Sequence, residues 1–346
     1  MTDTLASLSN NALYSATVVY VLAMLAHVLE WAMARDLPAP AVAATPALVG
    51  SASAGTGAHA AQSAGYSPQI PADATQAAQA QALPDSADAS ERSDRFGRIG
   101  LSLTVLGVLL HTAGVVMRGL AAERVPWGSM YEFAITGSLA VAVAYLFLVR
   151  RYSARWLGLL VTGLLVILLG LAVIVLYRPV GPLVPALHSY WLVIHVSAAA
   201  ISGGAFTIGA LASVLFLVRS RLERNVAGAA DAGSRRGFLW RLPSAEAIDR
   251  VSYRVHAFAF PLWTFAVLAG AIWAQYAWGR YWGWDPKEVW AFITWVVYAA
   301  YLHARATVGW RGTAAAYVAL FGFATFIFNF VGINLFGSGL HSYSGM

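Results

Sequence analysis

The chain has 346 residues, of which 59% are hydrophobic and only 11% are charged, and its formal net charge is +6. Its apolar residues come in blocks of about 20, the length that crosses the hydrocarbon core of a bilayer as a helix. A soluble globular fold is excluded, because it would have to bury every block. We therefore expect an all-α polytopic membrane protein whose helices contact the lipid bilayer.

In chain order, the blocks predict eight transmembrane helices. They fall at roughly residues 12–34, 98–120, 132–150, 156–177, 191–218, 254–277, 288–306 and 313–336. The first 11 residues contain no Lys or Arg, so the basic start of a cleavable signal peptide is missing. We expect the first span to be retained.

The composition changes sharply after the first span. Residues 36–97 are rich in Ala, Ser, Gly, Gln, Pro and Asp without an apolar period. Such a segment can bury too little apolar surface to offset the entropy of ordering it. We predict three parts: a first transmembrane helix at 1–35, a disordered cytoplasmic linker at 36–97, and a membrane domain of seven helices at 98–346.

The basic residues are distributed unevenly between alternate loops. Seventeen of the 22 lie in the loops around 35–98, 150–155, 219–254 and 305–311. The other set of loops holds Arg118, Arg124, Arg178, Arg280 and Lys287. Cytoplasmic loops carry the excess of Lys and Arg, so both termini and the loop at 278–290 are predicted to be periplasmic. The positive charge thus reflects topology, and we expect no nucleic-acid partner.

Cysteine is absent from the sequence. The chain therefore forms no disulfide, offers no thiolate to a metal and has no thiol redox chemistry of its own. Any thiol in its reaction has to come from a partner.

The loop at 278–290 reads WGRYWGWDPKEVW and lies between two apolar spans. Gly279 and Gly283 remove side-chain bulk, while Asp285 and Pro286 favour a turn followed by the start of a helix. Indole rings favour membrane surfaces, so an ordinary interfacial aromatic belt is one interpretation. The density of rings favours the other, an aromatic shelf presented on a shaped loop.

Two histidines are predicted to lie on the same side of the membrane as this loop. His195 is one turn inside the fifth span, and His341 follows the eighth span. Separately, each is explained as an interfacial or solvated histidine. Together with the indoles, they could clamp a planar metallomacrocycle, with imidazoles on the metal and Arg280 or Lys287 near its carboxylates.

Three other polar residues receive structural interpretations. We expect His111, midway along the second span, to pack or form hydrogen bonds, and His256 to be solvated at the inner end of the sixth span. Glu132 is expected to cap a helix start or to pair with Arg118 or Arg124.

These motifs resemble those of the haem handling proteins. Residues 278–288, WGRYWGWDPKE, are similar to the tryptophan-rich WWD signature, and the chain from about residue 98 resembles the CcsA/ResC-type proteins of system II cytochrome c biogenesis. Residues 126–133, PWGSMYEF, are similar to a second family segment, although Gly128 and Ser129 stand where the family has Ser-Asn. The segments around His195 and His341 also match.

The resemblance implies a cofactor, haem b (iron protoporphyrin IX), and its ligands. His195 and His341 resemble the two external histidines that ligate the haem iron over the tryptophan-rich loop, and His303 resembles the transmembrane histidine that holds a second haem. The second ligand of that haem would come from a CcsB/ResB-type membrane subunit. The loop residues implied at the external haem are Trp278, Arg280, Tyr281, Trp282, Trp284, Asp285 and Lys287.

The resemblance also implies an activity, that of a holocytochrome c synthase in the bacterial inner membrane with a periplasmic active face. Its substrate would be an apocytochrome c whose CxxCH thiols are kept reduced by a thioredoxin-like protein, so this chain needs no catalytic nucleophile. Asp285 has two interpretations, capping the seventh span or contacting a haem propionate. Two other functions remain open: a haem b electron carrier, and a transporter with interfacial aromatics.

Overall fold

The computed structural model of the chain describes residues 1–35, 37, 72–182, 185–227, 237–307, 309–337 and 339–341. Within these ranges the chain is helical and contains no strand, which confirms the all-α prediction. The long helices are α1 (Thr2–Met33), α2 (Ala72–Ala121), α3 (Met130–Tyr152), α4 (Gly158–Ile174), α5 (Tyr190–Ala227), α7 (Ala245–Trp278), α8 (Pro286–Thr307) and α9 (Thr313–Ile327). Short segments are η1 (Ala154–Leu157), η2 (Pro185–Leu187), α6 (Phe238–Arg241), the π-helical η4 (Phe328–Gly332) and α10 (Ile333–Phe336).

A helix occurs at each of the eight predicted spans, and seven of the described helical segments are long and apolar enough to cross a membrane. The eighth, α8, has 22 residues, about 33 Å at the α-helical rise, but is not among the seven. It is rich in Trp and Tyr, and Glu288 and Arg305 lie near its ends. The protein is thus polytopic, and α8 is the one long described helix outside those seven.

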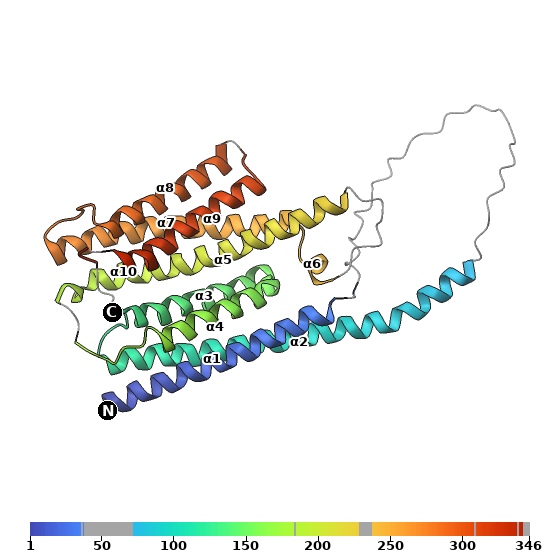
Figure 1. Ribbon diagram of the computed structural model, residues 1–346, viewed down its shortest axis with the longest axis horizontal. Coiled ribbons are helices and arrows are strands. Elements are labelled where there is room, and N and C mark those ends of the chain that lie inside the picture. Colours follow the sequence, from blue (N-terminus) through green and yellow to red (C-terminus); the bar gives the residue numbers. More distant parts are fainter. Residues whose placement is uncertain are drawn as a thin grey trace.

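The helices run side by side, with α1 to α4 in one half of the bundle and α5, α7, α8 and α9 in the other (Figure 1). Glycines of α2 permit the close approach of α1. A Cβ added at Gly107 would lie 2.7 Å from Tyr20, and one at Gly114 would lie 2.7 Å from Leu13. Small residues at helix contacts bring backbones together, which is the common way helices associate in membranes.

Helix α5 occupies the centre and joins the two halves. A Cβ at Gly204 would meet the backbone of α3, one at Gly203 would meet Phe326 near the end of α9, and one at Gly209 would meet His256 of α7. The small-residue face of α5 therefore fixes the position of α7, the helix that leads into the tryptophan-rich loop.

Helix α2 extends into the segment that was predicted to be a linker. Most of residues 36–71 lies outside the described part of the chain, but α2 already begins at Ala72, so residues 72–97 are helical. Ala and Gln favour helix, and the segment gains tertiary contacts near its end. Ser93 donates a hydrogen bond to the Glu30 carbonyl (3.0 Å), and Asp94 pairs with Arg155 (2.7 Å). These contacts extend α2 well beyond its apolar block.

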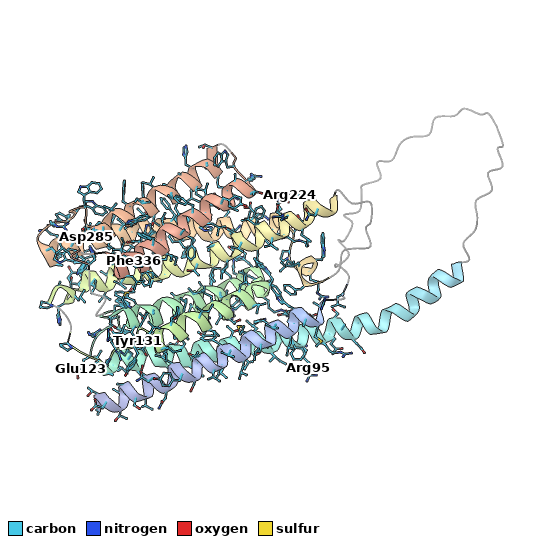
Figure 2. The ribbon with its side chains drawn as sticks, in the orientation of Figure 1. Arg95, Glu123, Tyr131, Arg224, Asp285 and Phe336 are labelled. Carbon is cyan, nitrogen blue, oxygen red and sulfur yellow. The ribbon has the colours of Figure 1, made fainter. Side chains whose placement is uncertain are left out.

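The two ends of the bundle differ in their residues. The N-terminus, the loop between α7 and α8, and the C-terminal residues lie at one end, which we call the tryptophan end (Figure 1). Asp285 and Glu123 lie at this end, whereas Arg95 and Arg224 lie toward the other, the arginine end (Figure 2). The start of α1 and the tryptophan loop thus lie at the same end of the bundle, and the side of the membrane that this end faces stays a prediction.

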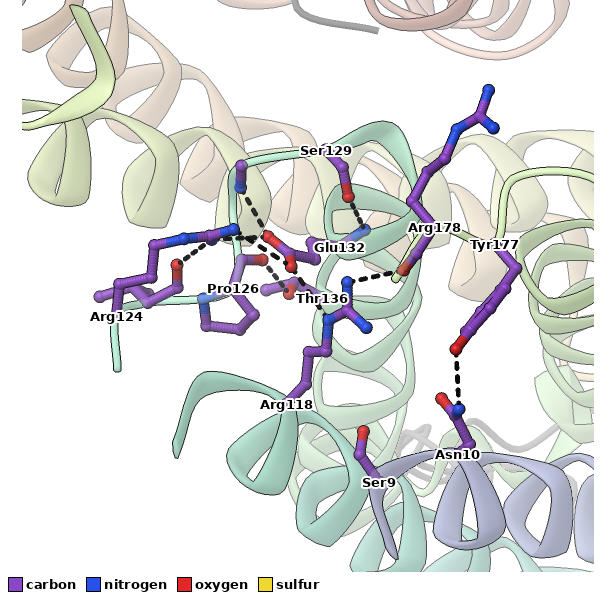
Figure 3. Close-up of polar contacts among 12 residues, drawn as sticks. Ser9, Asn10, Arg118, Arg124, Pro126, Ser129, Glu132, Thr136, Tyr177 and Arg178 are labelled. Atoms are coloured by element: carbon purple, nitrogen blue, oxygen red, sulfur yellow. Dashed lines mark hydrogen bonds and ion pairs between the residues drawn. The ribbon is translucent and has the colours of Figure 1, made fainter. Parts of the chain in front are cut away.

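A buried ion-pair cluster braces the tryptophan end (Figure 3). Arg118 of α2 and Glu132 of α3 are each 1% exposed, and Arg118 Nε donates to Glu132 Oε1 over 3.0 Å. Arg124 Nη1 donates to Glu132 Oε2 over 2.8 Å, and Arg118 also donates to the Arg178 carbonyl. The side chain of Ser129 caps α3 by accepting from the Glu132 N–H. The Glu132 carboxylate also accepts from the Gly128 N–H just before α3, so it acts both at the helix start and in the ion pair, as predicted.

Candidate functional site

The tryptophan-rich loop joins α7 to α8 through two residues of unusual backbone conformation. Gly279 ends α7 with φ +73°, and its N–H donates to the Gln275 carbonyl over 3.0 Å. Glycine adopts this left-handed conformation without the steric cost of a Cβ. Trp284 has φ +59°, which is rare for a bulky residue, just before Asp285 and the helix start at Pro286.

Glu288, in the first turn of α8, holds the loop together. Its Oε2 accepts from the backbone N–H groups of Gly283 (2.8 Å) and Asp285 (3.0 Å), and its Oε1 accepts from Arg280 Nη1 (3.2 Å). The carboxylate is 7% exposed. The reciprocal bond to the Asp285 N–H resembles a capping box, which fixes the loop to the helix start.

Asp285 connects this loop to the C-terminal residues. Its Oδ1 accepts from the Lys287 N–H (3.1 Å) and from His341 Nδ1 (2.9 Å), and its Oδ2 accepts from the Leu340 N–H (2.8 Å). The predicted capping role is therefore present. Contact of Asp285 with a haem propionate stays a prediction.

The pKa values of Asp285 and His341 depend on their surroundings. Burial acts against ionisation of Asp285, but the facing His341 and the N–H groups of Lys287 and Leu340 hold the pKa of that carboxyl below its usual value. Burial lowers the pKa of the His341 imidazole, and the neighbouring Asp285 opposes this effect. A neutral imidazole that donates to a carboxylate must carry its hydrogen on Nδ1. Its Nε2 then has a free lone pair.

His195 is fixed in the same way from a different element. It lies in the second turn of α5, and its Nδ1 lies 2.7 Å from the Ala266 carbonyl of α7. A carbonyl only accepts, so Nδ1 is again the donor and Nε2 keeps its lone pair. A Cβ at Gly270 would lie 2.7 Å from this ring, so α7 passes directly beside it.

Trp273 of α7 contacts both imidazoles. Its ring stacks on His195 at 6.1 Å and meets His341 edge to face at 5.6 Å. Trp278 also contacts His341, at 4.6 Å between centroids. Trp273 is 2% exposed, and its Nε1 donates to the Ala186 carbonyl, which holds the ring in place. The structure thus brings His195, His341 and two indoles together at the tryptophan end.

Two pairs of histidines, His27 with His256 and His195 with His341, differ in the surroundings of their Nε2 atoms. In His27 and His256 this atom is enclosed and has no hydrogen-bond partner among the described residues. In His195 and His341, Nδ1 is bonded but Nε2 is neither enclosed nor bonded within the described chain. Axial haem ligands are imidazoles of this kind, with one nitrogen fixed and the other open. The donor set therefore fits a haem iron.

The other predicted loop residues lie apart from the histidines or have protein partners. Arg280 pairs with Glu288, and Lys287 Nζ donates to Asn334 Oδ1 of α10 over 2.8 Å. Trp282 and Trp284 contact each other, with centroids 5.8 Å apart. Tyr281 and Trp284 are 60% and 66% exposed. These rings form the exposed surface of the loop, and none of them contacts an imidazole among the described residues.

His303 lies elsewhere, in the last turns of α8 toward the arginine end. Its side chain is exposed, and only its backbone carbonyl accepts a hydrogen bond, from Thr307. Nearby, Arg305 forms a bidentate ion pair with Asp249 of α7, at 2.8 and 3.0 Å. The end of α8 is thus anchored while His303 faces away from the bundle.

The solvated interpretation of His256 was wrong. This residue is fully buried, and its Nδ1 donates to the Ser252 carbonyl over 2.8 Å. Tyr298 and Tyr301 of α8 contact its ring at 5.4 Å. The helix that covers it comes from a distant part of the sequence, so local position gave a misleading expectation. His111 does form hydrogen bonds as predicted, to the Ile135 carbonyl (2.8 Å) and to Tyr20 (3.4 Å).

Sequence reasoning missed two residues of the site. Trp273 was taken as part of an apolar span, although it lies five residues before Trp278 and so one and a half turns away on α7. Glu288 was not among the predicted site residues. Its position three residues after Asp285, as in a capping box, was the available signal.

Comparison with known proteins places the chain in a family. A family model described as cytochrome C assembly protein matches residues 127–341. The cytochrome c biogenesis protein CcsA of Guillardia theta is 35% identical over 257 residues, covering 71% of this chain and 85% of the relative. CcsA of Synechococcus elongatus is 36% identical over 282 residues, covering 71% and 87%.

The chain belongs to the CcsA-type cytochrome c biogenesis proteins. As a member it is a multi-pass membrane protein with a role in cytochrome c biogenesis, and the matched region contains both site histidines. Among solved structures, a cytochrome c haem lyase CcmF aligns with a TM-score of 0.56 at 16% identity, over 96% of this chain and 50% of that chain. This CcsA-type chain therefore spans half the length of that protein, and the likeness concerns the fold.

Proposed function

We propose that this CcsA-type chain is the haem-binding subunit of a system II cytochrome c synthase, which presents haem at the periplasmic face for attachment to apocytochrome c. The observation that supports it most is the pair of imidazoles, His195 and His341, each fixed through Nδ1 and open at Nε2, around Trp273. We assign the bilayer to the bacterial inner membrane.

Each part of the site has a role in this proposal. His195 and His341 would hold the haem iron, while Trp273 and Trp278 pack beside the imidazoles. Haem b supplies two vinyl groups, to which the two thiols of a CxxCH segment add as thioethers. That addition forms a C–S bond and transfers the thiol hydrogen to carbon, so it needs no oxidant. The chain's contribution is orientation of the reacting groups.

Partners supply what the chain lacks. The sequence has no cysteine, so the thiols come from apocytochrome c and are kept reduced by a thioredoxin-like protein. The exposed His303 is assigned to a second haem, shared with a CcsB/ResB-type subunit that would cover this part of α8. An imidazole facing away from its own bundle suits a site completed by another chain.

The test is reconstitution in cells that lack their own synthase. This chain is produced with a CcsB-type subunit and an apocytochrome c, and haem-linked product is measured for His195→Ala, His341→Ala and His303→Ala. Each change is expected to lower the yield severely. His188→Ala is the matched control, because His188 is exposed at the same end and has no side-chain bond among the described residues. Full yield from both external variants would refute the proposed site.

The same experiment separates the electron-carrier alternative. A haem b electron carrier keeps its haem and forms no thioether. Purified complex that holds haem tightly, together with no covalent haem in the cytochrome c, would favour that function over the synthase.

A further inference from the structure

The two candidate ligands lie on different kinds of structure, one on a long helix and the other on a non-helical segment. His195 lies within the long helix α5, and its imidazole is bonded to a carbonyl in the middle of α7. His341 lies in the residues that follow α10, outside any helix. Moving His195 requires moving a packed central helix, whereas His341 lies on a non-helical segment.

The Asp285 carboxylate joins residues 340 and 341 to the tryptophan loop. Asp285 is 7% exposed and accepts from both the Leu340 N–H and His341 Nδ1. Its two oxygens thus hold the backbone and the side chain of neighbouring residues at the same time. The remaining contacts of His341 among the described residues are its edge-to-face packing with Trp273 and Trp278.

Gly339 is fitted to the same carboxylate. A Cβ added at this position would collide with Asp285 Oδ2. The main chain can therefore approach the carboxylate closely enough for the Leu340 bond only because residue 339 is glycine. This is an independent sign that the contact between the chain end and Asp285 is built into the sequence.

We propose that Asp285 is a latch that makes His341 the releasable haem ligand, while His195 is the permanent one. The inference rests on the proposed haem-binding function. Asp285 fixes Nδ1–H toward itself, which directs the Nε2 lone pair away, and it holds residues 339–341 against the loop. When the histidine of CxxCH approaches the iron, the latch opens and His341 leaves. Asp285 is a positioning residue in this scheme, since it acts through His341.

An exchangeable ligand suits the chemistry of hand-over. The synthase must keep the iron coordinated while it waits for substrate, yet must release the product afterwards. A ligand on a non-helical segment that is joined to the loop through Asp285 can leave without moving a transmembrane helix. The structure offers that property at His341 and not at His195.

Two variants distinguish a latch role of Asp285 from a role in capping α8. Asp285→Ser keeps a good cap for α8, because a serine hydroxyl can accept from the Lys287 N–H, but it cannot also reach Leu340 and His341. Gly339→Ala leaves Asp285 intact and displaces the chain end. If the latch exists, the two variants behave alike. If Asp285 is only a cap, Asp285→Ser resembles the wild type.

The first readout needs no haem. The chain has no native cysteine, so a single Leu340→Cys carries a spin label without competing sites. In the full-length, haem-free chain the label is expected to be immobilised, and either Asp285→Ser or Gly339→Ala should mobilise it. Unchanged label mobility in both variants would overturn the latch, whether or not the protein binds haem.

The second readout uses the haem-loaded complex with the CcsB-type subunit. Exogenous imidazole should replace the protein ligand at least about tenfold faster in Asp285→Ser and Gly339→Ala than in wild type, because losing an outer partner of a ligating histidine weakens binding by 10–100-fold. Equal exchange rates would contradict the assignment of His341 as the latched ligand. If His195→Ala and His341→Ala leave the haem spectrum unchanged, the proposed function fails, and the label mobility still decides the latch.

Discussion

The indole ring of Trp273 stacks on the imidazole of His195, with 6.1 Å between the ring centroids and 9° between their planes. Because the same indole also meets His341, it couples the position of one candidate ligand to that of the other. The candidate haem site is therefore an aromatic cluster as much as a pair of histidines.

Replacing this ring tests its contribution. Trp273→Leu keeps apolar volume but removes the stack, so the haem affinity of the purified complex should fall by about 3- to 10-fold, the value of one aromatic pair. Trp273→Phe keeps a ring and should retain more haem. Haem bound per complex is measured by absorbance during titration. Equal affinities for Leu and Phe variants would show that ring stacking contributes nothing.

Gly270 provides a way to move His195 without changing it. A Cβ at this position would lie 2.7 Å from the imidazole, so Gly270→Ala should displace the ring and reduce the fraction of haem with its normal spectrum. Gly170→Ala is the control, because a Cβ in α4 there meets no atom within 4 Å. A normal haem spectrum in both variants would mean that His195 can shift freely.

The ion pair of Arg118 and Glu132 is expected to stabilise the tryptophan end. Both side chains are 1% exposed, so Glu132→Gln leaves a buried guanidinium without its counter-charge and should cost about 3–5 kcal/mol. Glu246→Gln breaks an exposed pair with Arg250 and should cost no more than about 1 kcal/mol. Thermal unfolding in detergent measures both. Similar losses for the two variants would contradict the assigned role of burial.

His303 should matter only in the assembled complex. Its side chain is exposed and has no bond among the described residues, so His303→Ala should change the stability of the isolated chain by less than about 0.5 kcal/mol. In the complex with the CcsB-type subunit, the same variant should bind less haem. A large loss of stability in the isolated chain would show instead that His303 supports the bundle.

The transmembrane architecture was predictable because it depends on local composition. Apolar blocks set the positions of all eight helices, and the turn formed by Asp285 and Pro286 set the start of α8. The start of α1 and the tryptophan loop lie at one end of the bundle, and the periplasmic orientation inferred from the charge pattern stays a prediction. The extension of α2 to Ala72 was missed, because its contacts with Glu30 and Arg155 come from other helices.

The sequence pointed to the candidate ligands of the site but not to the residues that hold them. His195 and His341 were found because histidine is costly in and near a membrane. The contact of Asp285 with His341 depends on the chain returning after 56 residues to place His341 beside it, which no local pattern encodes. The burial of His256 has the same origin, since Tyr298 and Tyr301 arrive from α8.

The most direct test of the central claim is the spin state of ferric haem in the purified complex. For the external site, two imidazole ligands predict a low-spin signal in wild type that is lost in His195→Ala and in His341→Ala and is restored by added imidazole. His188→Ala should match the wild type. A low-spin signal that persists unchanged in both external variants, with no response to imidazole, would contradict ligation by this pair.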